Sequence, residues 1–391
     1  MSKGYILSAI RTPIGRFLGT LAPFSATQLG SIAIKGAVEK AGVDTNHIDE
    51  VIMGHVVQAN CGQNPARQAL VGANLHTHTN ALTINKVCGS GLKAIMLASQ
   101  AIQLGEADVI IAGGMESMTN CPYYLDKART DGYRYGDGIL IDGVVRDGLW
   151  CAFGQTHMGN LAEYTAKTGN VTRDEADDYS FKSQDKAAKA IESNLFKDEI
   201  VPIAIPQKKG DPILFAKDET PRPTTMESLS KLKPAFDKDG VITAGNAPGL
   251  SDGASAVVVV SEKIAKERKP IAQIIDYATA HVEPKQLFWA PIYAVKKLLE
   301  KTGLKISDFD LIEANEAFAV QCIVDGQGLE WDWNKVNITG GAIALGHPIG
   351  ASGARIIATL INGLKRTGGK KGLATLCLGG GGAVAMAIEL V

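Results

Sequence analysis

The amino-acid sequence predicts an α/β protein built from two similar halves. Glycine is abundant, with 43 residues in a chain of 391, and aromatic residues make up only 6%. This composition favours an enzyme with many tight turns over a repeat or stacking scaffold. Apolar strands alternate with helical patterns, which predicts parallel or mixed sheets covered by helices on both faces. A chain of this length should form two or three packed units or one large duplicated domain.

The duplication is visible as two patterns that occur in the same order in both halves. Residues 49–57 are predicted to form an apolar strand that leads into a turn, and residues 310–318 have the same sequence pattern. Residues 89–114 are typical of a helix followed by a strand, and so are residues 351–380. Two similarities in the same order predict two homologous halves.

The stretch between the halves has a different character. It is richer in charge, proline and irregular turns, although a helix is predicted over about residues 173–194. We interpret this stretch as a subdomain inserted over the catalytic face, because loops often carry binding residues. A solvent-exposed excursion without a role is the alternative. The predicted division is therefore 1–117 with 250–269 for the first half, 118–249 for the insertion and 270–391 for the second half.

Composition argues against several classes of partner and cofactor. The formal net charge is −1, so the chain has no strong positive charge that would favour binding to nucleic acid or to an anionic membrane. No apolar run approaches the length that spans a bilayer, and no signal peptide is expected at the N-terminus. None of the six cysteines forms a C-x-x-C pair, so neither a zinc site nor a thioredoxin-type site is predicted. We therefore expect a reducing, cytoplasmic environment.

Cys88 is the first candidate catalytic residue. It follows an apolar strand, precedes a helix and is flanked by glycines in the run Asn-Lys-Val-Cys-Gly-Ser-Gly. Unpaired N–H groups and a partial positive charge at a helix N-terminus stabilise a thiolate, so we expect a lowered pKa for this cysteine. The same N–H groups are suited to an oxyanion hole. The alternative is a buried structural cysteine, but the glycine setting favours a nucleophile.

Two further residues complete a chemical set. His347 lies in Gly-His-Pro-x-Gly, a turn from which the imidazole can project and accept a thiol proton. Cys377 ends an apolar strand before four glycines, which suits a substrate crossing close to the backbone. P-loop and dinucleotide signatures are missing there. A nucleophilic thiol, a second thiol that moves a proton and an activating imidazole suit acyl transfer through a thioester, followed by carbon–carbon bond chemistry. Asn315, at a strand end, is equally compatible with an oxyanion site and a helix N-cap.

Five sequence blocks together resemble the thiolase family over essentially the whole chain. They are CGSGLKA at 88–94, GGMESM at 113–118, NEAFA at 315–319, GGA through GHPIGASGAR at 340–355, and C-x-GGG at 377–381. The chain is most similar to the short-chain, biosynthetic-type members. The resemblance implies an α/β thiolase fold, in which duplicated halves form a five-layered α-β-α-β-α core with an inserted loop subdomain.

The resemblance also implies a reaction and a role for each candidate. Two molecules of acetyl-CoA would condense to acetoacetyl-CoA plus CoA, or the reverse thiolysis would occur, by a ping-pong mechanism through acylated Cys88. His347 would deprotonate Cys88, and Cys377 would abstract the α-carbon proton of the second substrate. Asn315, through a held water, would form one oxyanion hole with His347. The backbone N–H groups of Cys88 and Gly379 would form the other.

The substrates implied by the family are CoA and its thioesters, with no permanently bound cofactor and no metal. Arg222 would meet the adenine–ribose end of CoA. Two departures from the family pattern are Pro248, where many relatives carry a small hydroxyl residue, and Leu287, where many short-chain members carry methionine. The CoA contacts carried over from the family are Leu149, His157, Met158, Arg222, Ser228, Phe236, Ala244, Ala317 and Phe318.

The family resemblance further implies a homotetramer, a dimer of dimers, in which dimers pair across a sheet edge. Residues 123–145 resemble the loop through which short-chain members form tetramers. Three alternatives to the short-chain enzyme stay open at this point. They are a degradative 3-ketoacyl-CoA thiolase for longer chains, a catalytically silent CoA-binding scaffold, and a ketoacyl-carrier-protein synthase. The second cysteine at position 377 argues against the last, which normally pairs its cysteine with two histidines.

Overall fold

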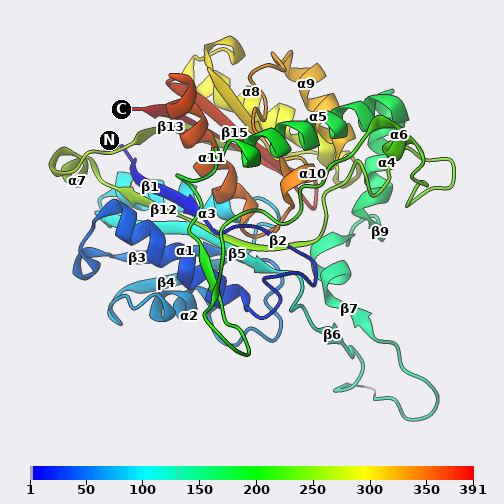
Figure 1. Ribbon diagram of the computed structural model, residues 1–391, viewed down its shortest axis with the longest axis horizontal. Coiled ribbons are helices and arrows are strands. Elements are labelled where there is room, and N and C mark those ends of the chain that lie inside the picture. Colours follow the sequence, from blue (N-terminus) through cyan, green and yellow to red (C-terminus); the bar gives the residue numbers. More distant parts are fainter. Residues whose placement is uncertain (1–2, 131) are drawn as a thin grey trace.

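The computed structural model describes residues 3–130 and 132–391 and has an α/β architecture with the predicted duplication (Figure 1). The first half contains, in order, β1 (Tyr5–Arg11), α1 (Ala26–Ala41), β3 (Glu50–Gly54), α2 (Pro65–Gly72), β4 (Asn80–Ile84), α3 (Ser90–Leu104), β5 (Val109–Ser117) and β12 (Ser251–Val260). The second half contains β13 (Ala272–His281), α8 (Ala290–Thr302), β14 (Leu311–Ala314), α9 (Ala319–Leu329), α10 (Ala342–Leu345), α11 (Ser352–Thr367), β15 (Lys371–Leu378) and β16 (Gly382–Leu390).

The strand order is the same in both halves. In the first half β4, β3 and β5 are parallel, and β12 and β1 follow antiparallel. In the second half β14 and β15 are parallel, and β16 and β13 follow antiparallel. A parallel bridge from Ile312 to Val336 stands where β4 stands in the first half. Two antiparallel pairs between β1 and β13 join the halves into one continuous sheet.

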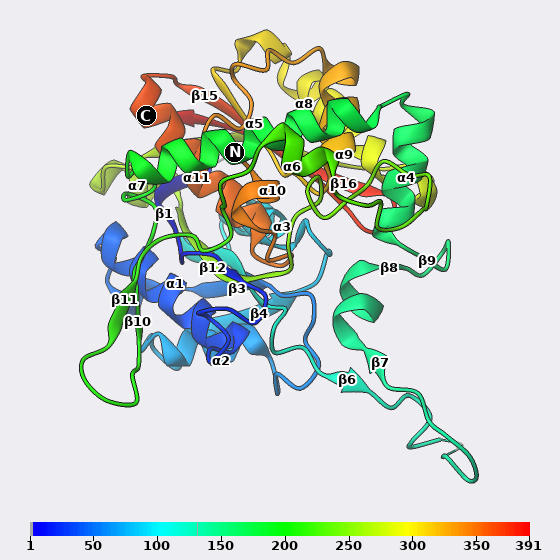
Figure 2. The ribbon, with the colours of Figure 1, turned by 45° about the vertical axis from the view of Figure 1, so that its right-hand side comes forward.

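Side-chain alternation along the strands produces five layers, which confirms the predicted core (Figures 1 and 2). In β12, Val257 and Val259 face a cluster that contains α3 and α11, whereas Val258 faces α1 and α2. In β16, Val384 faces the same central cluster, whereas Ala385 faces α8. Because successive side chains point to opposite faces of a sheet, each half-sheet is covered on both sides. The central layer, α3 with α11, is shared by both halves.

The central helices meet through glycines at their N-terminal turns. A Cβ atom at Gly91 would lie 2.8 Å from the backbone nitrogen of Ala354. A Cβ atom at Gly353 would overlap the backbone nitrogen of Leu92. Backbone atoms cannot rotate out of the way, so only glycine permits this approach. The contact brings together the loops that precede α3 and α11, which carry Cys88 and His347.

Residues 118–249 connect β5 to β12 and cross both halves (Figure 2). The predicted helix in this stretch is α5, which begins at a capping box of Thr172 and Glu175. A β6–β7 arm extends from the body of the protein (Figures 1 and 2). The proposed boundaries of the three units stay a prediction. The elements are β6 (Tyr123–Tyr124), β7 (Ile141–Asp142), a π-helix (Val144–Leu149), β8 (Trp150–Cys151), β9 (Thr156–His157), α4 (Met158–Thr168), α5 (Arg173–Glu192), β10 (Ile203–Ile205), β11 (Ile213–Phe215) and α6 (Met226–Ser230).

Short elements complete the fold: β2 (Gly15–Arg16), α7 (Glu262–Glu267), and 3-10 turns at Thr45–His47, Pro284–Trp289 and Ile306–Asp308. The strand predicted to reach residue 380 ends at Leu378. The reason is local, because Gly380 and Gly381 have φ values of 86° and 89°, which belong to a turn.

Replacement of Gly353 by alanine tests the contact between the central helices. Because the new Cβ would overlap the Leu92 backbone, we expect a loss of about 3 kcal/mol in the free energy of unfolding, the upper part of the usual range for overpacking. Gly363→Ala, on the same helix, is the matched control, since its Cβ would meet the side-chain ends of Leu311 and Ile338 and no backbone atom within 4 Å. It should change stability by less than about 1 kcal/mol. Denaturant unfolding measures both; equal effects would contradict the argument.

Candidate active site

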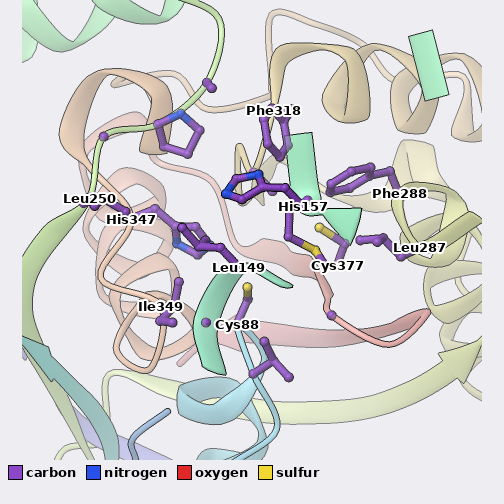
Figure 3. Close-up of a pocket in the computed structure, with 18 of the residues that line it drawn as sticks. Cys88, Leu149, His157, Leu250, Leu287, Phe288, Phe318, His347, Ile349 and Cys377 are labelled. Carbon is purple, nitrogen blue, oxygen red and sulfur yellow. The ribbon is translucent and has the colours of Figure 1, made fainter. Parts of the chain in front are cut away.

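Cys88, His347 and Cys377, which are remote along the chain, line one cavity of about 450 Å³ (Figure 3). Cys88 lies in the loop between β4 and α3, and His347 lies in the turn between α10 and α11. Cys377 lies at the end of β15. The duplicated topology places the two loops at equivalent positions in the two halves, immediately before the central helices. The structure therefore brings together the three residues that the sequence singled out.

The turn at Cys88 is held in an unusual backbone conformation. Ser90 Oγ accepts a hydrogen bond from the Lys86 N–H at 2.8 Å and donates one to the Val87 carbonyl at 2.6 Å. Val87 has φ of 48°, a region that β-branched residues rarely adopt. Such strain costs about 1–3 kcal/mol and persists where the surroundings enforce it. Gly89 caps α3, which begins at Ser90. The strained turn presents the half-buried Cys88 thiol to the cavity.

The prediction of a lowered pKa for Cys88 is wrong. Burial raises the pKa of this thiol to about 12, although hydrogen bonds from the backbone N–H groups of Cys88 and Gly379 act in the opposite direction. The helix N-terminus is present as expected, but desolvation of the charged form outweighs it. Cys88 is therefore a neutral thiol in the resting protein. The two N–H groups nonetheless both donate toward the Cys88 sulfur.

Hydrogen bonds define the protonation of His347. Its Nδ1 lies 2.7 Å from Ser352 Oγ, and Ser352 Oγ lies 2.9 Å from the Pro348 carbonyl. A carbonyl only accepts, so the single Ser352 proton is donated to Pro348, and Ser352 accepts from His347 Nδ1–H. The other ring nitrogen, Nε2, consequently carries the lone pair. A neutral imidazole with a free Nε2 can act as a general base.

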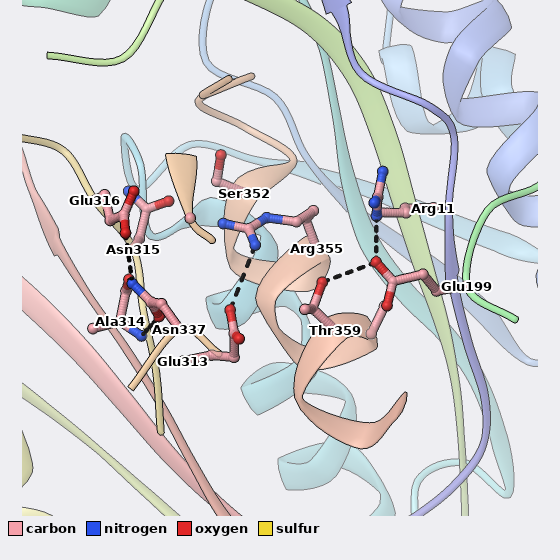
Figure 4. Close-up of polar contacts among 12 residues, drawn as sticks. Arg11, Glu199, Glu313, Ala314, Asn315, Glu316, Asn337, Ser352, Arg355 and Thr359 are labelled. Atoms are coloured by element: carbon pink, nitrogen blue, oxygen red, sulfur yellow. Dashed lines mark hydrogen bonds and ion pairs between the residues drawn. The ribbon is translucent and has the colours of Figure 1, made fainter. Parts of the chain in front are cut away.

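A buried network of ionisable side chains lies near Ser352, the hydrogen-bond partner of His347 (Figure 4). The Arg355 guanidinium, on α11, lies 3.5 Å from the Glu313 carboxylate. Glu199 accepts hydrogen bonds from Arg11 Nε at 2.7 Å and from Thr359 Oγ1 at 3.0 Å. Burial, and secondarily the Arg355 cation, lower the pKa of His347 to about 3. His347 is thus held neutral, which matches the neutral state of Cys88.

Asn315 lies beside His347 and outside the cavity lining. Its Nδ2 is 3.5 Å from His347 Nε2, and its buried Oδ1 has no hydrogen-bond partner within residues 3–130 and 132–391. The neighbouring Glu316 carboxylate fixes this segment by accepting hydrogen bonds from Tyr179, Ser183, Asn337 and the Ile343 N–H. Asn315 precedes a loop and does not cap α9, whose N-cap is Phe318. The amide is therefore available to a polar group near His347.

Cys377 is buried, with only 1% of its surface exposed. Burial, and secondarily the charge of a Cys88 thiolate, raise the pKa of Cys377 well above its usual value. The two thiols thus lie close enough to influence each other. A thiol of this kind is neutral at rest, and its thiolate is a strong base when it forms.

Eleven of the predicted residues line the cavity: Cys88, His347, Cys377, Gly379, Leu149, His157, Met158, Phe236, Ala244, Ala317 and Phe318. Arg222 and Ser228 do not line the cavity. Both are exposed near α6, where the Ser228 hydroxyl donates a hydrogen bond to the Thr225 carbonyl at 2.8 Å. Their predicted contacts with CoA stay a prediction. Pro248 and Leu287, the two departures from the family pattern, do lie in the wall. The lining residues without a predicted role in binding are Val87, Val145, Gly148, Ala235, Thr243, Ala247, Gly249, Leu250, Phe288, Ile349 and Leu378.

The wall of the cavity is mostly apolar and suits a long, flexible substrate. The rings of His157 and Phe236 stack with their centroids 4.8 Å apart. His157 Nδ1 accepts the Gly159 N–H at 3.0 Å, so this ring also caps α4. Phe288 and Phe318 meet edge to face, with centroids 5.3 Å apart. These pairs give the cavity a fixed shape in which few polar groups converge, as is typical of small-molecule sites.

None of the helices described within 3–130 and 132–391 combines the length and apolar character needed to cross a bilayer. The same residues contain no group of three or more His, Cys, Asp or Glu side chains that could hold a metal ion.

Comparison with known proteins gives one consistent result. The family model "Thiolase, N-terminal domain" matches residues 4–263, and "Thiolase, C-terminal domain" matches residues 268–390. The chain is 51% identical over 392 residues to acetyl-CoA acetyltransferases of Cupriavidus necator, with 100% of both chains covered, and of Escherichia coli K12, with 100% and 99% covered. The crystal structure of the Bacillus anthracis acetyl-CoA acetyltransferase superposes with a TM-score of 0.97 at 43% identity, covering 100% of this chain and 99% of that one.

The lowered pKa of His347 makes stability depend on pH. In the unfolded chain the imidazole binds a proton below about pH 6.5, whereas in the folded chain it stays neutral down to a pKa of about 3. The folded state therefore loses stability as the pH falls below the unfolded pKa. Between about pH 8 and pH 5 the wild type should lose about 2 kcal/mol more than His347→Asn. Urea unfolding of both proteins measures this difference; parallel losses would show that His347 titrates normally.

Proposed function

Because the chain belongs to the thiolase family, we propose that it is an acetyl-CoA C-acetyltransferase, which condenses two molecules of acetyl-CoA to acetoacetyl-CoA and CoA and catalyses the reverse thiolysis. The observation that carries the proposal is the shared cavity of Cys88, His347 and Cys377. Relatives about half identical over their full length bear the name of this activity. CoA thioesters are the substrates.

In the first half-reaction Cys88 becomes acetylated. Its proton moves to His347 Nε2 as the sulfur attacks the thioester carbon, so that two neutral groups react without a buried charge beforehand. The carbonyl oxygen that becomes negative is held by the backbone N–H groups of Cys88 and Gly379. Cys377 gives its proton to the departing CoA thiolate. The acetyl-enzyme is left with a His347 imidazolium and a Cys377 thiolate, which together are electrically neutral.

In the second half-reaction the Cys377 thiolate takes a proton from the methyl carbon of the second acetyl-CoA. The enolate oxygen is held by the His347 Nε2–H and by a water on the Asn315 amide. The enolate carbon attacks the acetyl carbon on Cys88, and the carbon–sulfur bond breaks. The Cys88 sulfur then recovers its proton from His347. The two half-reactions together therefore return every proton, and acetoacetyl-CoA is the product.

Two cysteine variants test this division of labour. Cys88→Ser should fold normally and lose nearly all turnover, since a serine hydroxyl is a far weaker nucleophile than a thiolate. Cys377→Ala should still become acetylated on Cys88 and should fail in condensation. Intact-mass measurement after incubation with labelled acetyl-CoA reads the first step, and acetoacetyl-CoA formation reads the second. Wild-type turnover in Cys88→Ser, or no acetyl-enzyme in Cys377→Ala, would contradict the assignment.

A second candidate function is that of a degradative 3-ketoacyl-CoA thiolase. It differs from the proposed function mainly in the length of the acyl chain that the enzyme accepts. Buried Leu287 and Phe288, with Phe318, close the cavity near Cys377 and leave room for short acyl groups. Acetoacetyl-CoA should therefore be cleaved at least about tenfold faster, in kcat/KM, than a ten-carbon 3-ketoacyl-CoA, because misfit of several methylenes costs more than 1.4 kcal/mol. Comparable cleavage of the longer substrate would favour the degradative function.

The proposal extends to a homotetramer, a dimer of dimers. Strand β4 is the last strand at one edge of the sheet and offers backbone groups to a second copy. The β6–β7 arm carries highly exposed apolar side chains, among them Tyr135, Ile139 and Leu140, which are typical of an association surface. We also place the enzyme in cytoplasmic fatty acid metabolism, a setting in which six free cysteines stay reduced.

A further inference from the structure

Two of the sequence blocks shared with the family meet outside the catalytic cavity. Glu116, in the block GGMESM, lies near the end of β5, and Gly350 lies in the GHPIG turn that carries His347. A Cβ atom at Gly350 would lie 2.8 Å from Glu116 Oε2 and equally close to the Met115 carbonyl oxygen. The turn of His347 therefore lies directly against the end of β5. Glu116 itself does not line the cavity.

One oxygen of the Glu116 carboxylate joins the two halves. The side chain is fully buried, and its Oε2 accepts the Gly350 N–H at 2.9 Å and the Val56 N–H at 3.1 Å. Gly350 belongs to the second half of the chain, whereas Val56 follows β3 in the first. A carboxylate oxygen can accept two hydrogen bonds at once, and its negative charge strengthens both. This oxygen therefore ties the turn of His347 to the loop after β3.

The loop after β3 is bonded in turn to the segment that carries Cys88. Asn85 Nδ2 donates a hydrogen bond to the Val56 carbonyl at 3.3 Å. Asn85 Oδ1 accepts the Val87 N–H at 2.9 Å, and Val87 is the residue of positive φ directly before Cys88. A side chain that bonds the backbone two residues further on forms an Asx turn, which stabilises such a conformation. Hydrogen bonds therefore connect the Cys88 turn to Glu116.

The other carboxylate oxygen keeps the Glu116 side chain in place. Oε1 accepts the Val57 N–H at 3.2 Å and lies 3.3 Å from Nε2 of His55, whose side chain is only 1% exposed. Burial lowers the pKa of His55, but the opposing influences, of which the Glu116 carboxylate is the largest, raise it to about 9. The imidazolium therefore supplies a counter-charge, without which a buried carboxylate would be costly.

We propose that Glu116 is a positioning residue, whose Oε2 sets the distance between the Cys88 thiol and the His347 imidazole, with His55 as its counter-charge. The proposal rests on the acetyltransferase function proposed above, in which His347 takes the proton of Cys88. A displacement of about 1 Å between reacting groups can lower a rate about a hundredfold. Because Glu116 does not line the cavity, its loss should affect the chemical step far more than the binding of substrate.

Two substitutions at position 116 test the bridging oxygen. Glu116→Met has a similar length but no carboxylate oxygen, so kcat for thiolysis of acetoacetyl-CoA should fall about a hundredfold while KM stays within about twofold. In Glu116→Gln the amide oxygen can take the place of Oε2, and the amide nitrogen can donate to a neutral His55 ring. This variant should be at least about tenfold more active than Glu116→Met. Wild-type kcat in folded Glu116→Met, or equal activity of the two folded variants, would overturn the role of the oxygen.

Asn85→Ala tests the same path at an exposed side chain, where no loss of folding is expected. It removes both hydrogen bonds of this side chain and should lower kcat about tenfold with KM unchanged. Asn120→Ala is the matched control. Asn120 is also exposed and donates to the backbone carbonyls of Ala22 and Phe24 at 3.0 and 3.1 Å. This control should keep the wild-type kcat, and an equal kcat in Asn85→Ala would overturn the proposed path.

A chemical probe separates this proposal from the proposed function. Alkylation of Cys88 by iodoacetamide uses the nearby imidazole but no CoA substrate, and peptide mass spectrometry reads its rate. Glu116→Met and Asn85→Ala should each slow this alkylation at least about fivefold, in the same direction as His347→Asn. Asn120→Ala should leave it unchanged. Slowed alkylation supports the positioning role even where the wild type fails to cleave acetoacetyl-CoA, a result that would overturn only the proposed function. Wild-type alkylation rates in both Glu116→Met and Asn85→Ala would overturn the positioning role.

Discussion

The close approach of α3 and α11 is the constraint on which the active site depends. Each helix begins where a catalytic loop ends, one after Cys88 and the other after His347. The first turns touch at Gly91 and Gly353, where side chains would collide with backbone. Any larger residue would separate the helices and with them the thiol and the imidazole. The packing of the central layer thus sets the distance between the residues in the cavity, although neither glycine lines the cavity itself.

The cavity controls chemistry mainly by excluding water. Burial acts in opposite directions on the two residue types, raising the pKa of both cysteines and lowering that of His347. The three side chains are therefore uncharged at rest, and in the proposed reaction charges form only as matched pairs. This arrangement avoids the large cost of an isolated buried ion. In the proposed reaction, the raised pKa of Cys377 makes its thiolate a strong base for the step that removes a proton from a weakly acidic methyl group.

The sequence predicted the fold, and it singled out three residues that the structure brings into one cavity, because both depend on local patterns. Strand–helix alternation identified the duplicated halves, and glycine-flanked Cys88, His347 and Cys377 stood out from other residues of their types. The pKa of Cys88 depends on burial by surroundings from both halves. The helix N-terminus alone therefore predicted a pKa shift in the wrong direction. Wall residues such as Val145 and Ile349 are ordinary apolar residues without a sequence signal, and only tertiary packing brings them to the cavity.

The two halves also hold each other's loops, which explains why neither half alone could form this site. Glu116, from the first half, accepts the Gly350 N–H of the second half, and so anchors the turn that carries His347. Ser251, in β12, accepts the His347 N–H at 3.1 Å. In the other direction, Gly379 directs its N–H toward Cys88. Since each half supplies hydrogen bonds to the candidate catalytic residue of the other, the geometry of the site forms only when the complete five-layered core has assembled.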